Sequence, residues 1–210
     1  MSTTIQWLGH ASFKISHNSE VIYIDPWKIK NAARDATLVL VSHSHYDHYS
    51  SDDIAKVSGA NAKLIAPADV ITQEGTGEQI LPGLAKGLDG IVVQGIAAYN
   101  PLKQFHPKLN QWLGFIIQVG SKRIYYAGDT DLIEEMKAID DISIALLPVG
   151  GTYTMNAAEA AEATRQINPE TAIPYHWGDI VGSRKDAEDF AKKASCEVKI
   201  LNPGQAIELQ

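Results

Sequence analysis

Hydrophobic and polar residues alternate along the first 25 residues in three short runs, which is the pattern of strands with one buried face. The runs are residues 4–9 (TIQWLG), 12–16 (SFKIS) and 21–25 (VIYID), with turn residues between the second and the third. Residues 36–42 (ATLVLVS) are apolar almost throughout, which indicates a strand buried on both faces. The start of the chain therefore predicts an antiparallel meander followed by a central strand.

The same order of elements recurs later in the chain. Two apolar runs within residues 112–128 meet at Gly120 and Ser121, which predicts a hairpin. A buried strand at 142–151 and a helix at 156–167 follow, the helix with a capping box at its start. The other predicted elements are strands at 90–99 and 171–178, a helix at 183–195, a closing hairpin of 197–201 with 206–209, and irregular surface at 73–90.

Because the pattern runs twice, up to about residue 100 and again from about residue 112, we predict two similar halves. Sheets would pack together with helices outside them. The chain has 210 residues, of which 45% are hydrophobic, so it can bury a core as a single domain over residues 1–210.

Composition limits the partners and the location. The net charge of -7, with no basic run or aromatic and basic stripe, argues against nucleic acid and leaves a small-molecule substrate. Cys196 is the only cysteine, which excludes an internal disulfide and suits the cytoplasm. No signal peptide or membrane span is predicted, and a homo-oligomer is left open.

Three of the seven histidines lie within six positions, directly after the predicted strand at 36–42. In this sequence, HSHYDH, His43 and His45 are on alternate residues and can face one metal ion. Asp47 and His48 are adjacent and suit a second ion a few ångströms away. The alternative is a solvated polar turn. The motif predicts half of the ligand shell of two metal ions.

Other polar residues at strand ends are candidates to complete the shell. Asp129 follows the strand RIYYAG and could bridge two cations, and His176 ends the strand in TAIPYHWG. The alternatives are a turn aspartate and a structural histidine. Asp25 could orient a ligand histidine or end a turn before proline, and His10 could line the pocket or be a core histidine.

HSHYDH, AGDTD and IPYHWG, in this order, resemble the metallo-β-lactamase superfamily. The phrases WLGHASFKI, IDPW and LLPVGGTYTMNAAEAAEA resemble its small metal-dependent hydrolases, which include the ascorbate-6-phosphate lactonase and, more distantly, the N-acylphosphatidylethanolamine phospholipase D. The resemblance spans nearly the whole chain. It implies a four-layer αββα sandwich with the site along the edge where the two sheets meet.

The resemblance also implies a role for each candidate ligand. His43 and His45 would bind the first ion, Asp129 would bridge the two, and the second would be held by Asp47, His48 and His176. The third histidine of the first site departs from the family pattern, because Asn100 stands roughly where relatives have it. An asparagine oxygen is a weak zinc ligand, so we expect His106 to take that place.

A pair of divalent ions predicts hydrolysis by a bridging hydroxide. The ions would be zinc, with manganese or iron as alternatives, and Asp47 could also accept the proton of the water. The predicted substrate is a small ester, lactone or phosphodiester. The alternatives are a nuclease, which the net charge disfavours, and a non-catalytic metal-binding module, which an intact ligand set disfavours.

Overall fold

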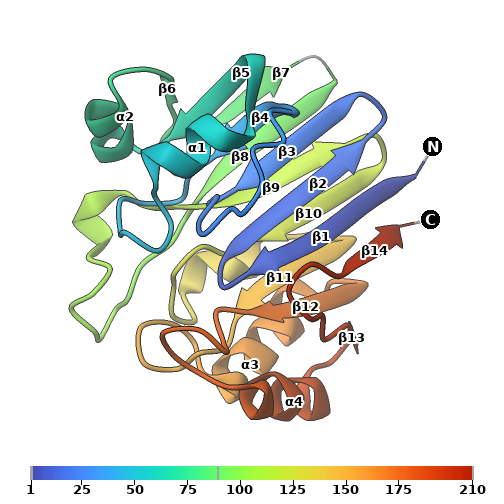
Figure 1. Cartoon of the computed structure of the whole chain (residues 1–210). Coiled ribbons are helices and arrows are strands. Elements are labelled where there is room, and N and C mark those ends of the chain that lie inside the picture. Colours follow the sequence, from blue (N-terminus) through green and yellow to red (C-terminus); the bar gives the residue numbers. More distant parts are fainter. Residues whose placement is uncertain (1, 89, 210) are drawn as a thin grey trace. The chain divides into compact units, whose positions relative to one another are not determined.

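The computed structural model describes residues 2–88 and 90–209, and it divides into two compact units (Figure 1). The first unit comprises Met1–Ile80 and Asn202–Gln210, and the second comprises Leu81–Leu201. Each contains one seven-stranded mixed sheet with α-helices. Residues 81–100 thus belong to the second unit, whereas the sequence pattern assigned them to the first half.

The first sheet has the strand order β14-β1-β2-β3-β4-β5-β6. Strands β1, β2 and β3 form the predicted antiparallel meander, and β3, β4, β5 and β6 run parallel to one another. The bounds are β1 Thr3–Gly9, β2 Ser12–His17, β3 Glu20–Ile24, β4 Ala36–Leu40, β5 Ser58–Ala66, β6 Glu78–Gln79 and β14 Ala206–Leu209.

Helices α1 (Ser51–Val57) and α2 (Ala68–Glu74) contribute to the core of the first unit. Ile54, Val57 and Val70 lie in one buried cluster with Val39 and Val41. Each buried side chain of this size contributes about 1.5–3 kcal/mol relative to an exposed one. This packing fixes β4, whose carboxyl end leads into the histidine motif.

The second sheet has the strand order β13-β12-β11-β10-β9-β8-β7. The pairs β7–β8, β8–β9 and β9–β10 are antiparallel, and the pairs β10–β11, β11–β12 and β12–β13 are parallel. Helices α3 and α4 pack against each other and against β11 and β12. The bounds are β7 Ala85–Leu88, β8 Ile91–Ala97, η1 Lys108–Asn110, β9 Leu113–Val119, β10 Lys122–Tyr126, η2 Glu134–Ala138, β11 Ile144–Pro148, α3 Ala157–Ile167, β12 Thr171–Tyr175, α4 Arg184–Lys193 and β13 Glu197–Val198.

The structure confirms the capping box of α3, where the Asn156 side chain accepts from the backbone N–H of Glu159 and the Glu159 side chain accepts from the backbone N–H of Asn156. Two predictions about chain segments are wrong. The closing hairpin does not form, because β13 pairs with β12 and β14 pairs with β1. The segment 73–90 is not wholly irregular, because it supplies β6 and β7. Short strands do not reveal their partners through their own sequence.

No helix formed by residues 2–88 and 90–209 is both long and apolar enough to cross a membrane.

Candidate metal centre

The candidate ligands of the first unit follow two neighbouring parallel strands. Ile24, the last residue of β3, pairs with Leu40, the last residue of β4. Asp25 and the segment 42–48 therefore leave the sheet at the same edge. The backbone N–H of Asp25 donates to the carbonyl of Leu40 at 2.9 Å, which continues the pairing beyond the strands. The sheet register places Asp25 beside the histidine motif.

Asp25 anchors the motif through a chain of hydrogen bonds. Its carboxylate accepts from the backbone N–H of Ser42 at 2.7 Å, from the Ser42 hydroxyl at 2.5 Å and from Nδ1 of His48 at 2.7 Å. The Ser42 hydroxyl gives its one proton to Asp25, so its oxygen accepts from Nδ1 of His43 at 2.9 Å. In His43 and His48 the proton is thus on Nδ1, and Nε2 carries the lone pair that a metal ion requires.

The spacing of His43 and His45 fits one metal ion. Nε2 of His43 lies 3.1 Å from Nδ1 of His45. Two nitrogens bound to one tetrahedral zinc at about 2.0–2.1 Å are about 3.3 Å apart. Ligand atoms of Asp25, His43 and His48 also lie within 4.8 Å of one another. However, Asp25 already accepts three hydrogen bonds, so we assign it an orienting role.

Asp47 lies between two histidines of the first unit. One of its carboxylate oxygens, Oδ2, is 3.0 Å from Nε2 of His10 and 3.8 Å from Nε2 of His48. A carboxylate only accepts, so the His10 ring donates to Asp47. The His10 side chain is buried, so this hydrogen bond holds the Asp47 carboxylate in place. Whether His10 also lines the pocket stays a prediction.

The candidate ligands of the second unit come from three separate loops. Strands β8, β10 and β12 point in one direction, and each is followed by one of the residues His106, Asp129 and His176. Oδ2 of Asp129 is 3.1 Å from Nε2 of His176 and 3.4 Å from Nε2 of His106. These distances suit ligands that share an ion, by the same geometry as above. Folding therefore brings together three residues that are far apart in the sequence.

Asn100 positions His106. Its side-chain oxygen accepts from the backbone N–H of His106 at 3.1 Å and from Nδ1 at 2.8 Å, while its amide nitrogen donates to the carbonyl of Tyr153 at 3.0 Å. The bond to Tyr153 fixes which end of the amide is the oxygen. Nδ1 of His106 therefore carries the proton, and Nε2 has the lone pair on the side of Asp129.

Three site residues adopt left-handed backbone conformations, with φ of 47° at His10, 45° at Asp25 and 61° at His176. Such a conformation costs a residue other than glycine about 1–2 kcal/mol, and it is concentrated at functional sites. Gly150 makes room for the turn at His176, because a Cβ at Gly150 would lie 2.4 Å from the His176 carbonyl oxygen. The backbone is thus strained at the residues that directly follow β1, β3 and β12.

The sequence did not reveal two functional residues. Ser42 directly precedes the histidine motif, and its position next to His43 was the available signal. Asn100 was considered only as a ligand, because nothing in the sequence predicts that the loop folds His106 back onto it. Both residues act by accepting a hydrogen bond from Nδ1 of a histidine.

Comparisons with known proteins agree on one family. Residues 4–176 match the family described as the beta-lactamase superfamily domain. A UPF0173 metal-dependent hydrolase of Pyrococcus abyssi is 33% identical over 226 residues, which cover 98% of this chain and 99% of the relative. Two solved structures are similar in fold over nearly the whole chain. A protein of Parabacteroides distasonis has a TM-score of 0.85 at 29% identity and covers 97% of this chain and 94% of its own. Igni18, described as a novel metallo hydrolase from Ignicoccus hospitalis, has a TM-score of 0.83 at 26% identity and covers 100% and 99%.

Proposed function

Because this chain belongs to the metallo-β-lactamase superfamily and is one of its metal-dependent hydrolases, we propose that it cleaves a small ester, lactone or phosphodiester with two divalent ions. The proposed ligands are His43, His45 and His106 for the first ion, Asp47, His48 and His176 for the second, and Asp129 for both.

One observation carries the proposal, namely the acceptors behind the histidines. Asp25 with Ser42 fixes the proton of His43 and of His48 on Nδ1, and Asn100 does the same for His106. Structural histidines have no general need for a uniform tautomer, whereas metal-ligating histidines nearly always donate their other nitrogen to a carboxylate, a carbonyl or water. Of the five histidines proposed as ligands, His43, His48 and His106 thus have the lone pair of Nε2 available for a metal ion.

The chemistry divides between the metal ions and the side chains. Bound ions would supply Lewis acidity, which lowers the pKa of water toward about 7 and stabilises a developing oxyanion. Asp47 would accept the proton of the attacking water. The hydrogen bond from His10 to Oδ2 of Asp47 would hold this carboxylate in place.

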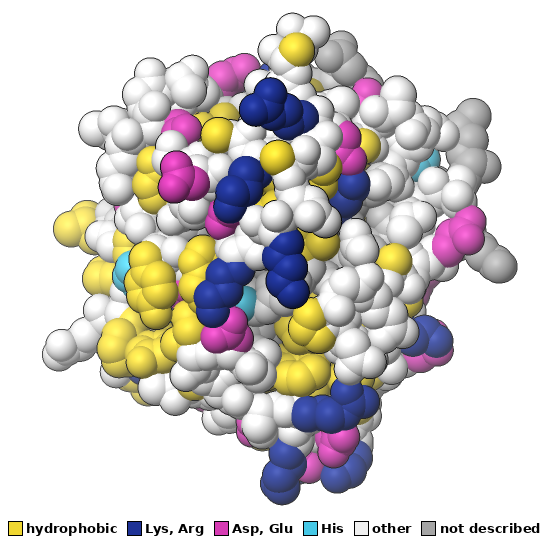
Figure 2. All heavy atoms as spheres, in the orientation of Figure 1, with side chains coloured by type: hydrophobic (Ala, Val, Ile, Leu, Met, Phe, Trp, Pro, Cys, Tyr) yellow, Lys and Arg dark blue, Asp and Glu magenta, His cyan; other side chains and the backbone are white. Residues whose placement is uncertain are grey.

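The net charge and the face seen in Figure 2 support a small substrate over a nucleic acid. Lys and Arg side chains are interspersed with Asp and Glu on the face seen in Figure 2, and the net charge is -7. A protein that binds the phosphate backbone concentrates positive charge along its contact face. Cytoplasmic location and oligomeric state stay predictions, as does zinc as the natural metal.

Metal analysis combined with a substrate panel tests the proposal. Purified protein should contain up to two divalent ions per chain. It should hydrolyse at least one class among p-nitrophenyl esters, lactones and bis(p-nitrophenyl) phosphate, and the class would separate acyl from phosphoryl chemistry. His45→Ala should lower turnover by at least about 10³-fold, because it removes a ligand from the site that activates water.

Tyr46→Ala is the matched control, since Tyr46 lies in the same loop with 69% of its surface exposed. This variant should keep its metal content. Near-zero metal content of the wild-type protein after remetallation would contradict the proposed site. Equal turnover of His45→Ala and wild type would place the chemistry elsewhere.

A further inference from the structure

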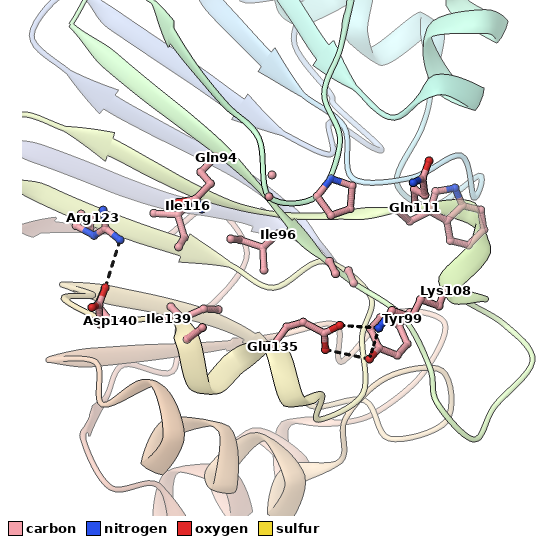
Figure 3. Close-up of a pocket in the computed structure, with 17 residues that line it drawn as sticks. Gln94, Ile96, Tyr99, Lys108, Gln111, Ile116, Arg123, Glu135, Ile139 and Asp140 are labelled. Carbon is pink, nitrogen blue, oxygen red and sulfur yellow. Dashed lines mark hydrogen bonds and ion pairs between the residues drawn. The ribbon is translucent and has the colours of Figure 1, made fainter.

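The second unit contains a cavity of about 580 Å³ that none of the proposed metal ligands lines. Its walls come from β8, β9, β10 and η2, and from both ends of the loop that carries His106. Figure 3 shows charged residues at its two ends and isoleucines between them. The volume is in the range of about 300–1,000 Å³ that is typical of small-molecule sites.

The middle of the cavity is apolar. Ile96, Ile116 and Ile139 project into it from two strands and from the end of η2 (Figure 3). Ala97, Ala98 and Ala138 also line it, so small side chains leave space beside the larger ones. A hydrocarbon or aromatic group that displaces water from this part of the cavity gains free energy in proportion to the apolar area that it buries.

One end of the cavity holds an arginine with unused donors. The Nη2 atom of Arg123 makes only long contacts, 3.4 Å to the carbonyl of Asp140 and 3.8 Å to its Oδ1. Its Nε is buried and has no hydrogen-bond partner within the described part of the chain. The Asp140 side chain is 90% exposed, so its charge is largely screened by water.

At the other end of the cavity the charged groups of Lys108 and Glu135 already bind each other. Nζ of Lys108 donates to Glu135 at 2.7 Å and to the Tyr99 hydroxyl at 3.2 Å, and that hydroxyl donates to Glu135 at 2.9 Å. The hydrogen bonds that Lys108 donates to Glu135 and Tyr99 raise the pKa of Lys108. Burial raises the pKa of Glu135, but the bonds from Lys108, the backbone and Tyr99 outweigh it and lower this pKa. An anion therefore gains most at the Arg123 end.

We propose that this cavity is a second ligand site, separate from the metal centre, and that it binds a small amphipathic carboxylate. A guanidinium carries five N–H donors in one plane and pairs with the oxygens of a carboxylate. Because Nε of Arg123 is buried, the carboxylate would lie against the Nη groups, on the part of the side chain that is exposed. The apolar part would extend over Ile96, Ile116 and Ile139 toward Tyr99.

Calorimetry with octanoate tests the site on the metal-loaded protein. Octanoate should bind saturably at one site per chain, whereas 1-octanol should bind more weakly because it has no charge to pair with Arg123. Arg123→Gln should weaken octanoate binding by about tenfold or more. Arg165→Gln, which removes an exposed arginine that does not line the cavity, should leave it unchanged.

A second variant tests the cavity without touching the charge. Ala138 is exposed at the end of η2 and lines the cavity, so Ala138→Trp should fill it and weaken octanoate binding while the protein stays folded. Octanoate binding that survives both variants but disappears on chelation would assign the carboxylate to the metal ions and overturn the proposal. Absence of saturable binding to wild type up to millimolar octanoate would overturn it as well.

Discussion

The two units repeat one arrangement strand by strand. Strands β1 to β6 correspond to β8 to β13 in order and in direction, and β14 corresponds to β7, since each pairs antiparallel with the first strand of its meander. Helices α1 and α2 occupy the same places in the chain order as α3 and α4. In both units the polar residues of interest follow strands that end at one edge of the sheet.

The units differ in which loop carries the chemistry. In the first unit, β4 leads directly into the histidine motif, and its counterpart β11 leads into Gly150 and Gly151. In the second unit, the candidates are spread over the loops after β8, β10 and β12. One contiguous motif and three dispersed residues thus result from the same topology, because each loop can vary without disturbing the sheet.

Corresponding aspartates also have different surroundings. Asp25 follows β3 and accepts hydrogen bonds from Ser42 and His48, so its oxygens are occupied. Asp129 follows the corresponding strand, β10, and faces Nε2 of two histidines. An aspartate in the loop after the corresponding strand therefore orients a ligand in one unit and is proposed as a ligand in the other. Neighbouring donors decide its role.

The largest effect is expected when a dispersed ligand of the second unit is removed, and the test asks whether this loss is as large as for a ligand of the histidine motif. His106→Ala should lower turnover by about 10²–10³-fold or more and lower metal content, as His45→Ala does, because both would remove an imidazole from the first ion. Metal content by mass spectrometry and initial rates on the active substrate measure this. Normal metal content in His106→Ala would show that the third ligand of the first ion is a residue other than His106. Leu109→Ala, which changes a 92% exposed side chain of the same loop, is the control.

A smaller effect is expected for the acceptors that orient the histidines. Asp25→Asn and Asn100→Ala should each lower metal affinity or activity by about 10–100-fold, since such partners typically contribute that much. Asn100→Asp keeps an acceptor for Nδ1 of His106 and should lose less than Asn100→Ala. Chelator competition measures the affinities. Asn100→Ala with a loss as large as that of His106→Ala would indicate that Asn100 itself is a ligand.

The sequence predicted the fold class and family correctly, because the meanders and the motif are local patterns. The family and the presence of a metal-dependent hydrolase are confirmed, and so is the α/β metallo-β-lactamase fold. The partner of β14 and the loop that folds His106 onto Asn100 depend on contacts between distant residues. Such contacts leave no periodic signal, so Asn100 could be weighed as a ligand but not recognised as an orienting residue.

The smallest effect should arise from the backbone that supports His176. A Cβ at Gly150 would lie 2.4 Å from the carbonyl oxygen of His176 and 3.2 Å from its Nδ1, whereas a Cβ at Gly87 would meet no atom within 4 Å. Gly150→Ala should therefore destabilise the protein by about 1–3 kcal/mol through overpacking. Gly87→Ala, in the exposed strand β7, should be neutral or slightly stabilising because it restricts the unfolded chain.

Denaturant unfolding and metal content separate a local effect from a global one. If the clash shifts His176, Gly150→Ala should bind the second ion more weakly and keep the first, because the proposed first site has no ligand in this turn. Equal loss of both ions would instead indicate general unfolding. Gly150 lies in the loop after β11, which corresponds to the histidine-bearing loop after β4 in the first unit. Selective loss of the second ion would therefore show that this loop in the second unit supports the position of His176.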